Sequence, residues 1–131
     1  MILEEVQRKV FALELPPSDC VLFGSLPLLA HGLIESVNDI DILARASAWK
    51  HAQTFAKAEL APIGEWRVSL DDIEIYNAWL GMDVDAIINR AVFINGLPYA
   101  DLQDVLEFKQ KLNRPKDAEH IKKIQRFIAS N

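Results

Sequence analysis

The sequence predicts an α/β fold of the α+β kind, in which helices flank a small mixed β-sheet. Short apolar runs typical of buried strands alternate with segments whose apolar residues recur at helical spacing. A helical segment also separates the first two expected strands, which favours helices packed around a mixed sheet. The 131 residues suffice for one domain, spanning 1–131, that buries about two thirds of its unfolded surface.

The first half of the chain is expected to contain two strands and three helices. The first helix has apolar residues at helical spacing and ends where two prolines follow. Pro27 suits the first turn of the second helix, and Ser47 suits the N-cap of the third. The expected ranges are helix 2–14, strand 20–23, a short helix from Pro27 that Gly32 ends, strand 37–44 and helix 47–60.

The second half is expected to contain four strands and three helices. Asn95-Gly96 is the residue pair preferred in a two-residue hairpin turn. Asp83 and Asp101 are suitable N-caps, and Asp104 would complete a variant of the capping box. The expected ranges are strands 65–70 and 73–78, helix 84–90, a hairpin with strands 91–94 and 97–99, helix 101–112 and helix 117–129.

Composition limits the class of protein. Half of the residues are hydrophobic and a quarter are charged, as in ordinary globular proteins. No apolar run approaches the roughly 18–20 residues of a membrane span, and the acidic N-terminal segment does not look like a secretory signal. The single Cys20 is expected to be a buried, inert thiol. These features predict a cytoplasmic protein that does not contact a membrane.

The net charge of −5 hides an asymmetry along the chain. Residues 1–108 carry 7 basic and 17 acidic side chains, whereas residues 109–126 carry 7 basic and 2 acidic ones. One interpretation of the basic segment is a solvated helical face. The other is a basic flank that receives nucleotide phosphates or the end of an RNA.

Residues 20–42 form the most informative segment. An apolar strand leads into Gly24-Ser25, a short helix follows, and Asp39-Ile-Asp41-Ile lies on the next strand. Side chains alternate along a strand, so the two aspartates point the same way. Two negative charges side by side raise the free energy of the folded state unless a cation neutralises them. Mg²⁺ is a suitable cation, because it typically binds one or two carboxylates together with phosphates. The alternative for Gly24-Ser25 is a plain turn, and the alternative for the two aspartates is a solvated strand edge.

The pattern of Gly-Ser, thirteen residues and Asp-Ile-Asp-Ile resembles the signature of the nucleotidyltransferase fold superfamily, the DNA polymerase beta-like enzymes. Residues 95–106, Lys109 and residues 113–117 resemble the tail of its small stand-alone bacterial and archaeal members. The similarity covers about residues 20–125. It implies a minimal nucleotidyltransferase fold with C-terminal helices, in which a short mixed sheet carries the carboxylates along one edge.

The resemblance also implies roles for individual residues. Gly24 and Ser25 would bind the nucleotide phosphates, while Asp39 and Asp41 would be catalytic and bind Mg²⁺ in a two-metal site. Glu74, where the family often has aspartate, would be the third carboxylate, acting as a metal ligand or as the general base. The alternative for Glu74 is an exposed strand residue without a function. Asp72, two positions earlier, is the other candidate for the third carboxylate.

Lys109 and Arg114 occupy helix positions where the family also has basic residues, so they are candidates for binding the nucleotide. Asp117 would hold Arg114 or cap the last helix. A structural role for these residues is the alternative. The remaining polar and aromatic candidates are expected to have structural or surface positions: His31, His51, His120, Trp49, Trp66, Trp79 and Tyr76.

The activity implied by the resemblance is transfer of a nucleoside monophosphate from a nucleoside triphosphate, such as ATP, to a hydroxyl group. The acceptor would be a protein side chain, the 3′ end of an RNA or a small molecule. Small members often belong to toxin–antitoxin or phage-defence pairs, so a protein partner is a further expectation. The alternative functions are a non-catalytic partner module and, with less support, a nucleotide sensor. The base, the acceptor and the oligomeric state stay open.

Overall fold

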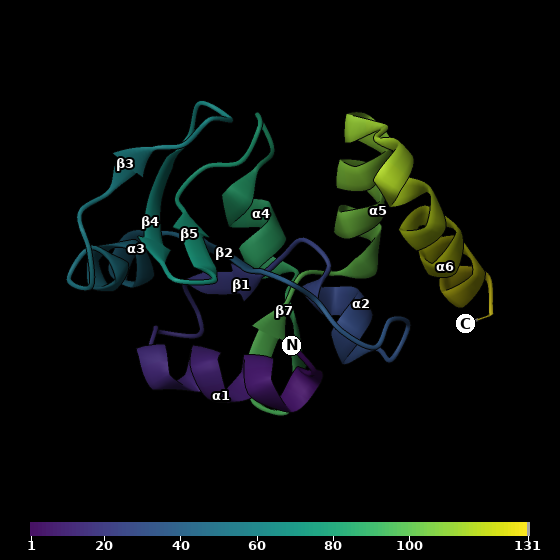
Figure 1. Ribbon diagram of the computed structural model, residues 1–131, viewed down its shortest axis with the longest axis horizontal. Coiled ribbons are helices and arrows are strands. Elements are labelled where there is room, and N and C mark those ends of the chain that lie inside the picture. Colours follow the sequence, from purple (N-terminus) through teal and green to yellow (C-terminus); the bar gives the residue numbers. More distant parts are fainter. Residues whose placement is uncertain (131) are drawn as a thin grey trace.

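A computed structural model describes residues 1–130. It contains one seven-stranded mixed sheet with helices on both faces, which confirms the predicted fold class (Figure 1). The strand order is β3-β4-β5-β2-β1-β7-β6. The strands are β1 (Cys20–Leu22), β2 (Ile40–Ala44), β3 (Glu59–Leu60), β4 (Trp66–Leu70), β5 (Ile73–Tyr76), β6 (Val92–Ile94) and β7 (Leu97–Tyr99).

Helices make up most of the rest of the chain, and the last two form a hairpin at one side of the molecule (Figure 1). A short 3-10 turn, η1 (Pro115–Asp117), joins these two helices. No helix among residues 1–130 is long and apolar enough to cross a membrane. The helices are α1 (Leu3–Leu13), α2 (Leu26–Ala30), α3 (Ala46–Ala52), α4 (Val84–Asn89), α5 (Leu102–Leu112) and α6 (Ala118–Ala129).

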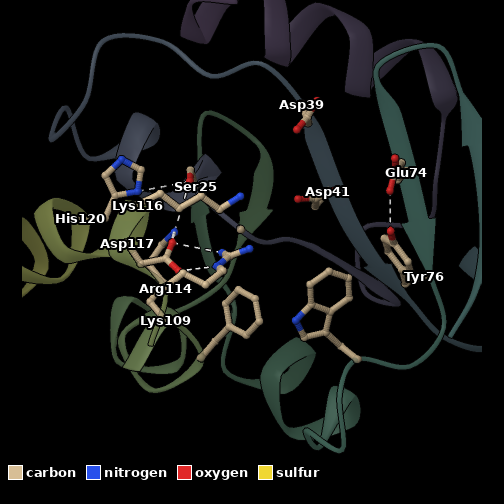
Figure 2. A pocket seen from close by; sticks show the side chains of 13 residues that line it. Ser25, Asp39, Asp41, Glu74, Tyr76, Lys109, Arg114, Lys116, Asp117 and His120 are labelled. Atoms are coloured by element: carbon tan, nitrogen blue, oxygen red, sulfur yellow. Dashed lines mark hydrogen bonds and ion pairs between the residues drawn. The ribbon is translucent and has the colours of Figure 1, made fainter. Parts of the chain in front are cut away.

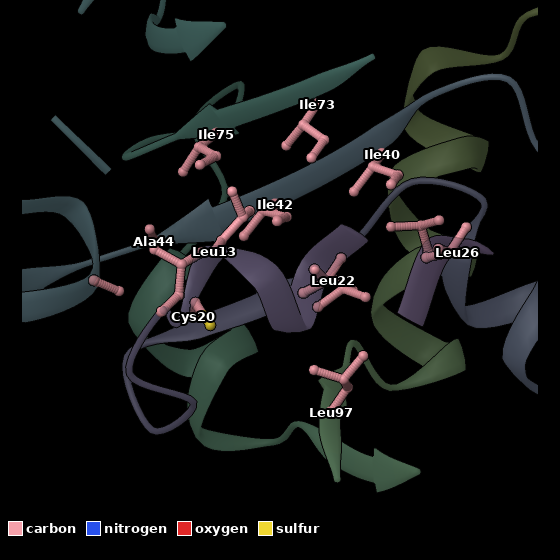
Figure 3. Packing of buried hydrophobic residues seen from close by; sticks show 14 of the residues in the cluster. Leu13, Cys20, Leu22, Leu26, Ile40, Ile42, Ala44, Ile73, Ile75 and Leu97 are labelled. Atoms are coloured by element: carbon pink, nitrogen blue, oxygen red, sulfur yellow. The ribbon is translucent and has the colours of Figure 1, made fainter. Parts of the chain in front are cut away.

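One face of the sheet packs against α1 and α3. Ile40 and Ile42 of β2 point into this layer, as their alternation with the aspartates predicts. Figure 3 shows them packed beside residues of β1 and β5. Cys20 is buried in the same cluster, which confirms the predicted burial. Burial raises the pKa of its thiol to about 12, which favours the protonated form.

The opposite face packs against α4, α5 and α6. Leu43 and Tyr76 point to this side, where Trp79 and Phe108 form edge contacts with neighbouring rings. Ile124 of α6 is fully buried and anchors the last helix to this layer. The layer covers only part of the face, so polar side chains near the ends of β2 and β5 border a cavity.

Strand pairing places the acidic residues next to one another. β2 runs parallel to β5, and this register puts Asp41 beside Glu74. β1 runs antiparallel to β2 and parallel to β7. Residues of neighbouring strands that are in register share a face, so the two carboxylates project from the same side of the sheet.

Several local predictions are confirmed. Asp83 caps α4 by accepting a hydrogen bond from the backbone N–H of Ala86, at 3.1 Å. Asp101 likewise caps α5. Asn95 and Gly96 both have positive φ, as a type I′ hairpin turn requires.

The capping predictions for Ser47 and Asp104 are wrong. Ser47 does not cap a helix reaching residue 60, because α3 begins at Ala46 and ends at Ala52, and Glu59 and Leu60 form β3. The Ser47 hydroxyl instead donates to Asp19 at 2.5 Å. Asp104 does not complete a capping box, because its carboxylate accepts two hydrogen bonds from Arg90.

Candidate functional site

The turn between β1 and α2 is built tightly against Asp41. Gly24 has a φ of +61°, a conformation that side chains rarely adopt. A Cβ at this position would lie 2.9 Å from Oδ2 of Asp41. The backbone N–H of Phe23 also donates to the Asp41 carbonyl oxygen at 2.9 Å. The turn therefore requires glycine both for its conformation and for the space that the carboxylate occupies.

Asp41 is half-buried on β2, whereas Asp39 lies just before the strand and is exposed. The prediction that the strand begins at residue 37 and carries both aspartates is therefore wrong for Asp39, because β2 begins at Ile40. Both line the cavity shown in Figure 2. Burial raises the pKa of Asp41 to about 6, and the negative charges of Glu74 and Asp39 add to this effect. The negative charge is therefore only partly compensated by the protein. Hard carboxylate oxygens in such a setting suit a divalent cation such as Mg²⁺.

Glu74 lines the same cavity and is already held by two neighbours. Its Oε2 accepts a hydrogen bond from the Tyr76 hydroxyl at 2.5 Å (Figure 2). The same oxygen accepts one from Arg67 at 3.3 Å. Within residues 1–130, no group of three or more His, Cys, Asp or Glu side chains is arranged to hold a metal. The role of Glu74 as a third metal ligand therefore stays a prediction.

Asp72, the rival of Glu74, belongs to a different region. Its carboxylate forms an ion pair with Lys9 of α1, at 2.6 Å. That hydrogen bond is the main reason why the pKa of Asp72 is lowered. Asp72 is not among the residues that line the cavity.

The cationic side of the cavity is built around Asp117. Lys109 and Asp117 are each about 2% exposed, and Nζ of Lys109 lies 3.3 Å from Oδ1 of Asp117. Arg114 donates to both Asp117 oxygens, at 2.6 and 3.1 Å. Burial favours a raised pKa for Asp117, but the hydrogen bond from Arg114 and the charge of Lys109 outweigh it and lower the pKa. Asp117 therefore holds two cations together at the cavity wall.

His120 also lines the cavity, which corrects its predicted surface position. Its Nδ1 lies 3.4 Å from Oγ of Ser25, and Nζ of Lys109 lies 3.4 Å from the same hydroxyl. Burial lowers the pKa of His120, and the charge of Lys109 lowers it further. Both effects favour the uncharged imidazole. Ser25 is thus the point where the turn after β1 meets the two C-terminal helices.

These residues enclose one cavity of about 330 Å³ with separated charges. Figure 2 shows the carboxylates of Asp39, Asp41 and Glu74 on the strand side. The cations lie on the helical side: Lys109, Arg114 and Lys116. All seven residues proposed from the sequence line this cavity: Gly24, Ser25, Asp39, Asp41, Glu74, Lys109 and Arg114.

Comparison with family models, with curated proteins and with solved structures gives no match for this chain. The nucleotidyltransferase resemblance therefore stays a prediction. What can be argued about chemistry comes from the cavity itself.

The sequence did not indicate every residue of this cavity. His120 and Tyr76 line the cavity, and Arg67 lies outside its lining but contacts Glu74. All three were missed because their contacts depend on helix docking and strand pairing. One signal was available for Arg67 and Tyr76, because each lies on the same side of its strand as Glu74 once the antiparallel register is known. Trp79 and Phe108 form an aromatic wall, which agrees with the packing role expected for Trp79.

Proposed function

We propose that this protein is a nucleotidyltransferase, which moves a nucleoside monophosphate from a nucleoside triphosphate to a hydroxyl acceptor. One observation carries the proposal: a single cavity has carboxylates on one wall and a positioned lysine–arginine pair on the opposite wall. A metal–triphosphate complex has the complementary distribution of charge, because its cation suits the carboxylates and its phosphates suit the basic wall.

In the proposed reaction, Ser25, Lys109 and Arg114 bind the phosphates. The hydroxyl oxygen of the acceptor forms a bond to the α-phosphorus, and the bond from the α-phosphorus to the bridging oxygen breaks. Pyrophosphate leaves with that electron pair, and the hydroxyl proton passes to a basic group of the site. Lys109 and Arg114 stabilise the charge that develops on the leaving group.

Asp39 and Asp41 are the residues that would hold Mg²⁺, and glycine at position 24 leaves room for the Asp41 carboxylate close to the backbone of the turn. When bound, the metal would supply positive charge to the phosphate oxygens. Glu74 joins this set only if it gives up its contact with Arg67 or keeps one oxygen available.

Isothermal titration with each nucleoside triphosphate, with and without Mg²⁺, tests the proposal. We expect binding that depends on Mg²⁺ and that is lost in Asp39→Asn and Asp41→Asn. Asp85→Asn is a control, because Asp85 is exposed on α4 and lies outside this cavity. Binding that does not require Mg²⁺, or no binding of any triphosphate, would contradict the proposed reaction.

A second candidate function is a partner module that keeps the fold but does not catalyse the reaction. The observation that favours it is the pairing of Glu74 with Arg67 and Tyr76, which occupies one oxygen of a carboxylate that the reaction would use. Arg67→Met separates the two functions. If the protein is an enzyme, we expect this variant to bind Mg²⁺ and triphosphate more tightly than the parent protein, because Glu74 is released. If it is a partner module, we expect the variant to bind them as the parent protein does.

A further inference from the structure

A second cavity, of about 290 Å³, adjoins the first. The two cavities share four residues, namely Ser25, Asp39, Asp41 and His120. The remaining wall of the second cavity comes from the segment between α2 and β2, which contributes Ile34, Ser36, Val37 and Asn38. Asp39 and Asp41 therefore border both cavities, whereas Glu74 lines only the first.

The segment that forms this wall is fixed at both ends. Nζ of Lys123 on α6 donates to the carbonyl oxygen of Leu33 at 3.2 Å. The N–H of Leu33 donates back to Leu28 of α2 at 2.9 Å. At the other end Val37 is buried, and its N–H donates to the carbonyl oxygen of Met1 at 3.0 Å. The second cavity is therefore a preformed part of the fold.

The two cavities differ in charge. The lining of the first includes three cations: Lys109, Arg114 and Lys116. Among the described residues, the lining of the second includes no lysine or arginine. Its polar groups are hydroxyls, an amide, the two shared carboxylates and the imidazole of His120. Burial lowers the pKa of His120, which favours the uncharged ring. The ammonium groups nearest this lining are already bound within the protein: Met1 to the carbonyl oxygen of Val37, Lys123 to that of Leu33, and Lys109 to Ser25 and Asp117. The lining itself presents two carboxylates, which would repel a polyanion.

We propose that the second cavity binds the acceptor, and that the acceptor is an uncharged hydroxyl compound instead of the phosphate-rich end of a nucleic acid. This inference rests on the proposed function. Ser36 and Asn38 supply hydrogen bonds to the polar groups of the acceptor. The shared wall of Asp39, Asp41 and His120 brings its hydroxyl to the border of the triphosphate cavity. The hydroxyl belongs either to a sugar-like small molecule or to a serine-type side chain.

Titrations followed by ¹H–¹⁵N NMR test this assignment with three probes. Glucose represents a small polyol, N-acetylserinamide represents a protein side chain, and the dinucleotide UpU represents an RNA end. We expect saturable shifts of the Ser36 and Asn38 amide signals with at least one uncharged probe, which also identifies the source of the hydroxyl. UpU is expected to bind at least tenfold more weakly. The proposal is overturned if neither uncharged probe moves these signals, or if UpU binds more tightly than both.

Neighbouring positions provide a matched pair of variants. Ser36 and Glu35 are both exposed, but only Ser36 lines the cavity. Ser36→Trp is expected to weaken probe binding at least tenfold, while Glu35→Trp leaves it within twofold. Both variants should bind Mg²⁺ and triphosphate within twofold of the parent protein. Equal probe binding in the two variants would overturn the assignment.

The same measurements separate this inference from the proposed function. Triphosphate that binds with Mg²⁺ while no uncharged probe binds would overturn the acceptor cavity alone. Probe binding at Ser36 without any Mg²⁺-dependent triphosphate binding would overturn the proposed reaction, yet support the second cavity as a site for uncharged hydroxyl compounds.

Discussion

At the scale of single residues, Asp41 gives the stability of the protein an unusual dependence on pH. The pKa of its carboxyl is about 6 in the folded protein, compared with about 3.9 in an unfolded chain. The folded state therefore binds the proton more tightly, so stability that is present below pH 4 is lost as the pH rises to 6.

Asp41→Asn removes this dependence. We expect the variant to unfold at a higher temperature than the parent protein at pH 7. Its free energy of unfolding should rise by at most about 3 kcal/mol, because asparagine carries no charge and removes the cost of ionising a carboxyl whose pKa folding raises by about two units. Melting temperatures measured from pH 4 to 7 check this. In the control Asp72→Asn the ion pair with Lys9 is lost, so stability at pH 7 should fall by no more than about 1 kcal/mol. A large drop for Asp41→Asn would show that this carboxylate is structural.

Asp117 and Asp104 form a second informative pair, because both carboxylates are buried and each is held by an arginine. Asp117→Asn leaves buried Lys109 without its counter-charge and should cost about 3–5 kcal/mol. Asp104→Asn should cost less, because Arg90 is 55% exposed and water solvates its charge. Urea unfolding measures both effects. Only Asp117→Asn should also weaken triphosphate binding in calorimetry, and equal effects on binding would remove Asp117 from the site.

At the scale of elements, the turn from β1 to α2 has requirements that differ from those of other turns. Gly24 and Gly81 both have positive φ, at 61° and 75°, so alanine at either position costs about 1–2 kcal/mol of backbone strain. Only at Gly24 would the new methyl group also press against Asp41. We therefore expect Gly24→Ala to lose more stability than Gly81→Ala and to abolish Mg²⁺-dependent triphosphate binding. Unchanged binding in Gly24→Ala would contradict the close approach proposed for this turn.

Signals that act within a few residues could be read from the sequence. Proline at the start of α2, the Asp83 cap and the Asn95-Gly96 turn each depend on local backbone chemistry, so they were predicted correctly. Ser47 and Asp104 were misread for the opposite reason. Their side chains are bound by Asp19 and Arg90, which are brought close only by tertiary packing.

The same distinction explains the candidate site. Asp41 follows from strand alternation and the turn at Gly24 follows from its glycine, so both were accessible to sequence reasoning. Asp39 lies just before β2, so alternation does not account for its position. Arg67 reaches Glu74 because β4 pairs with β5. His120 reaches Ser25 because α6 docks on the sheet layer. No spacing in the sequence encodes either contact directly.

At the scale of the whole molecule, the cavity joins two parts of the fold, because its acidic wall belongs to β2, β5 and the residue before β2, and its basic wall to α5, Arg114 and η1. Mg²⁺ and triphosphate together should therefore stabilise the protein more than the sum of their separate effects. At one hundred times the dissociation constant the expected gain is about 2.7 kcal/mol. Thermal unfolding with Mg²⁺ alone, triphosphate alone and both ligands measures this. Additive shifts would indicate that the two walls bind their ligands independently.

The parallel pairing of β1 with β7 has a consequence for how the protein folds. Leu22 pairs with Tyr99, so the contact closes a loop of about 77 residues at an entropic cost of about 4 kcal/mol. β7 leads directly into α5, so Lys109 can reach Ser25 only once this long-range contact has formed. We expect the ability to capture triphosphate to appear in the slowest refolding phase, after the local hairpins and helices have already formed.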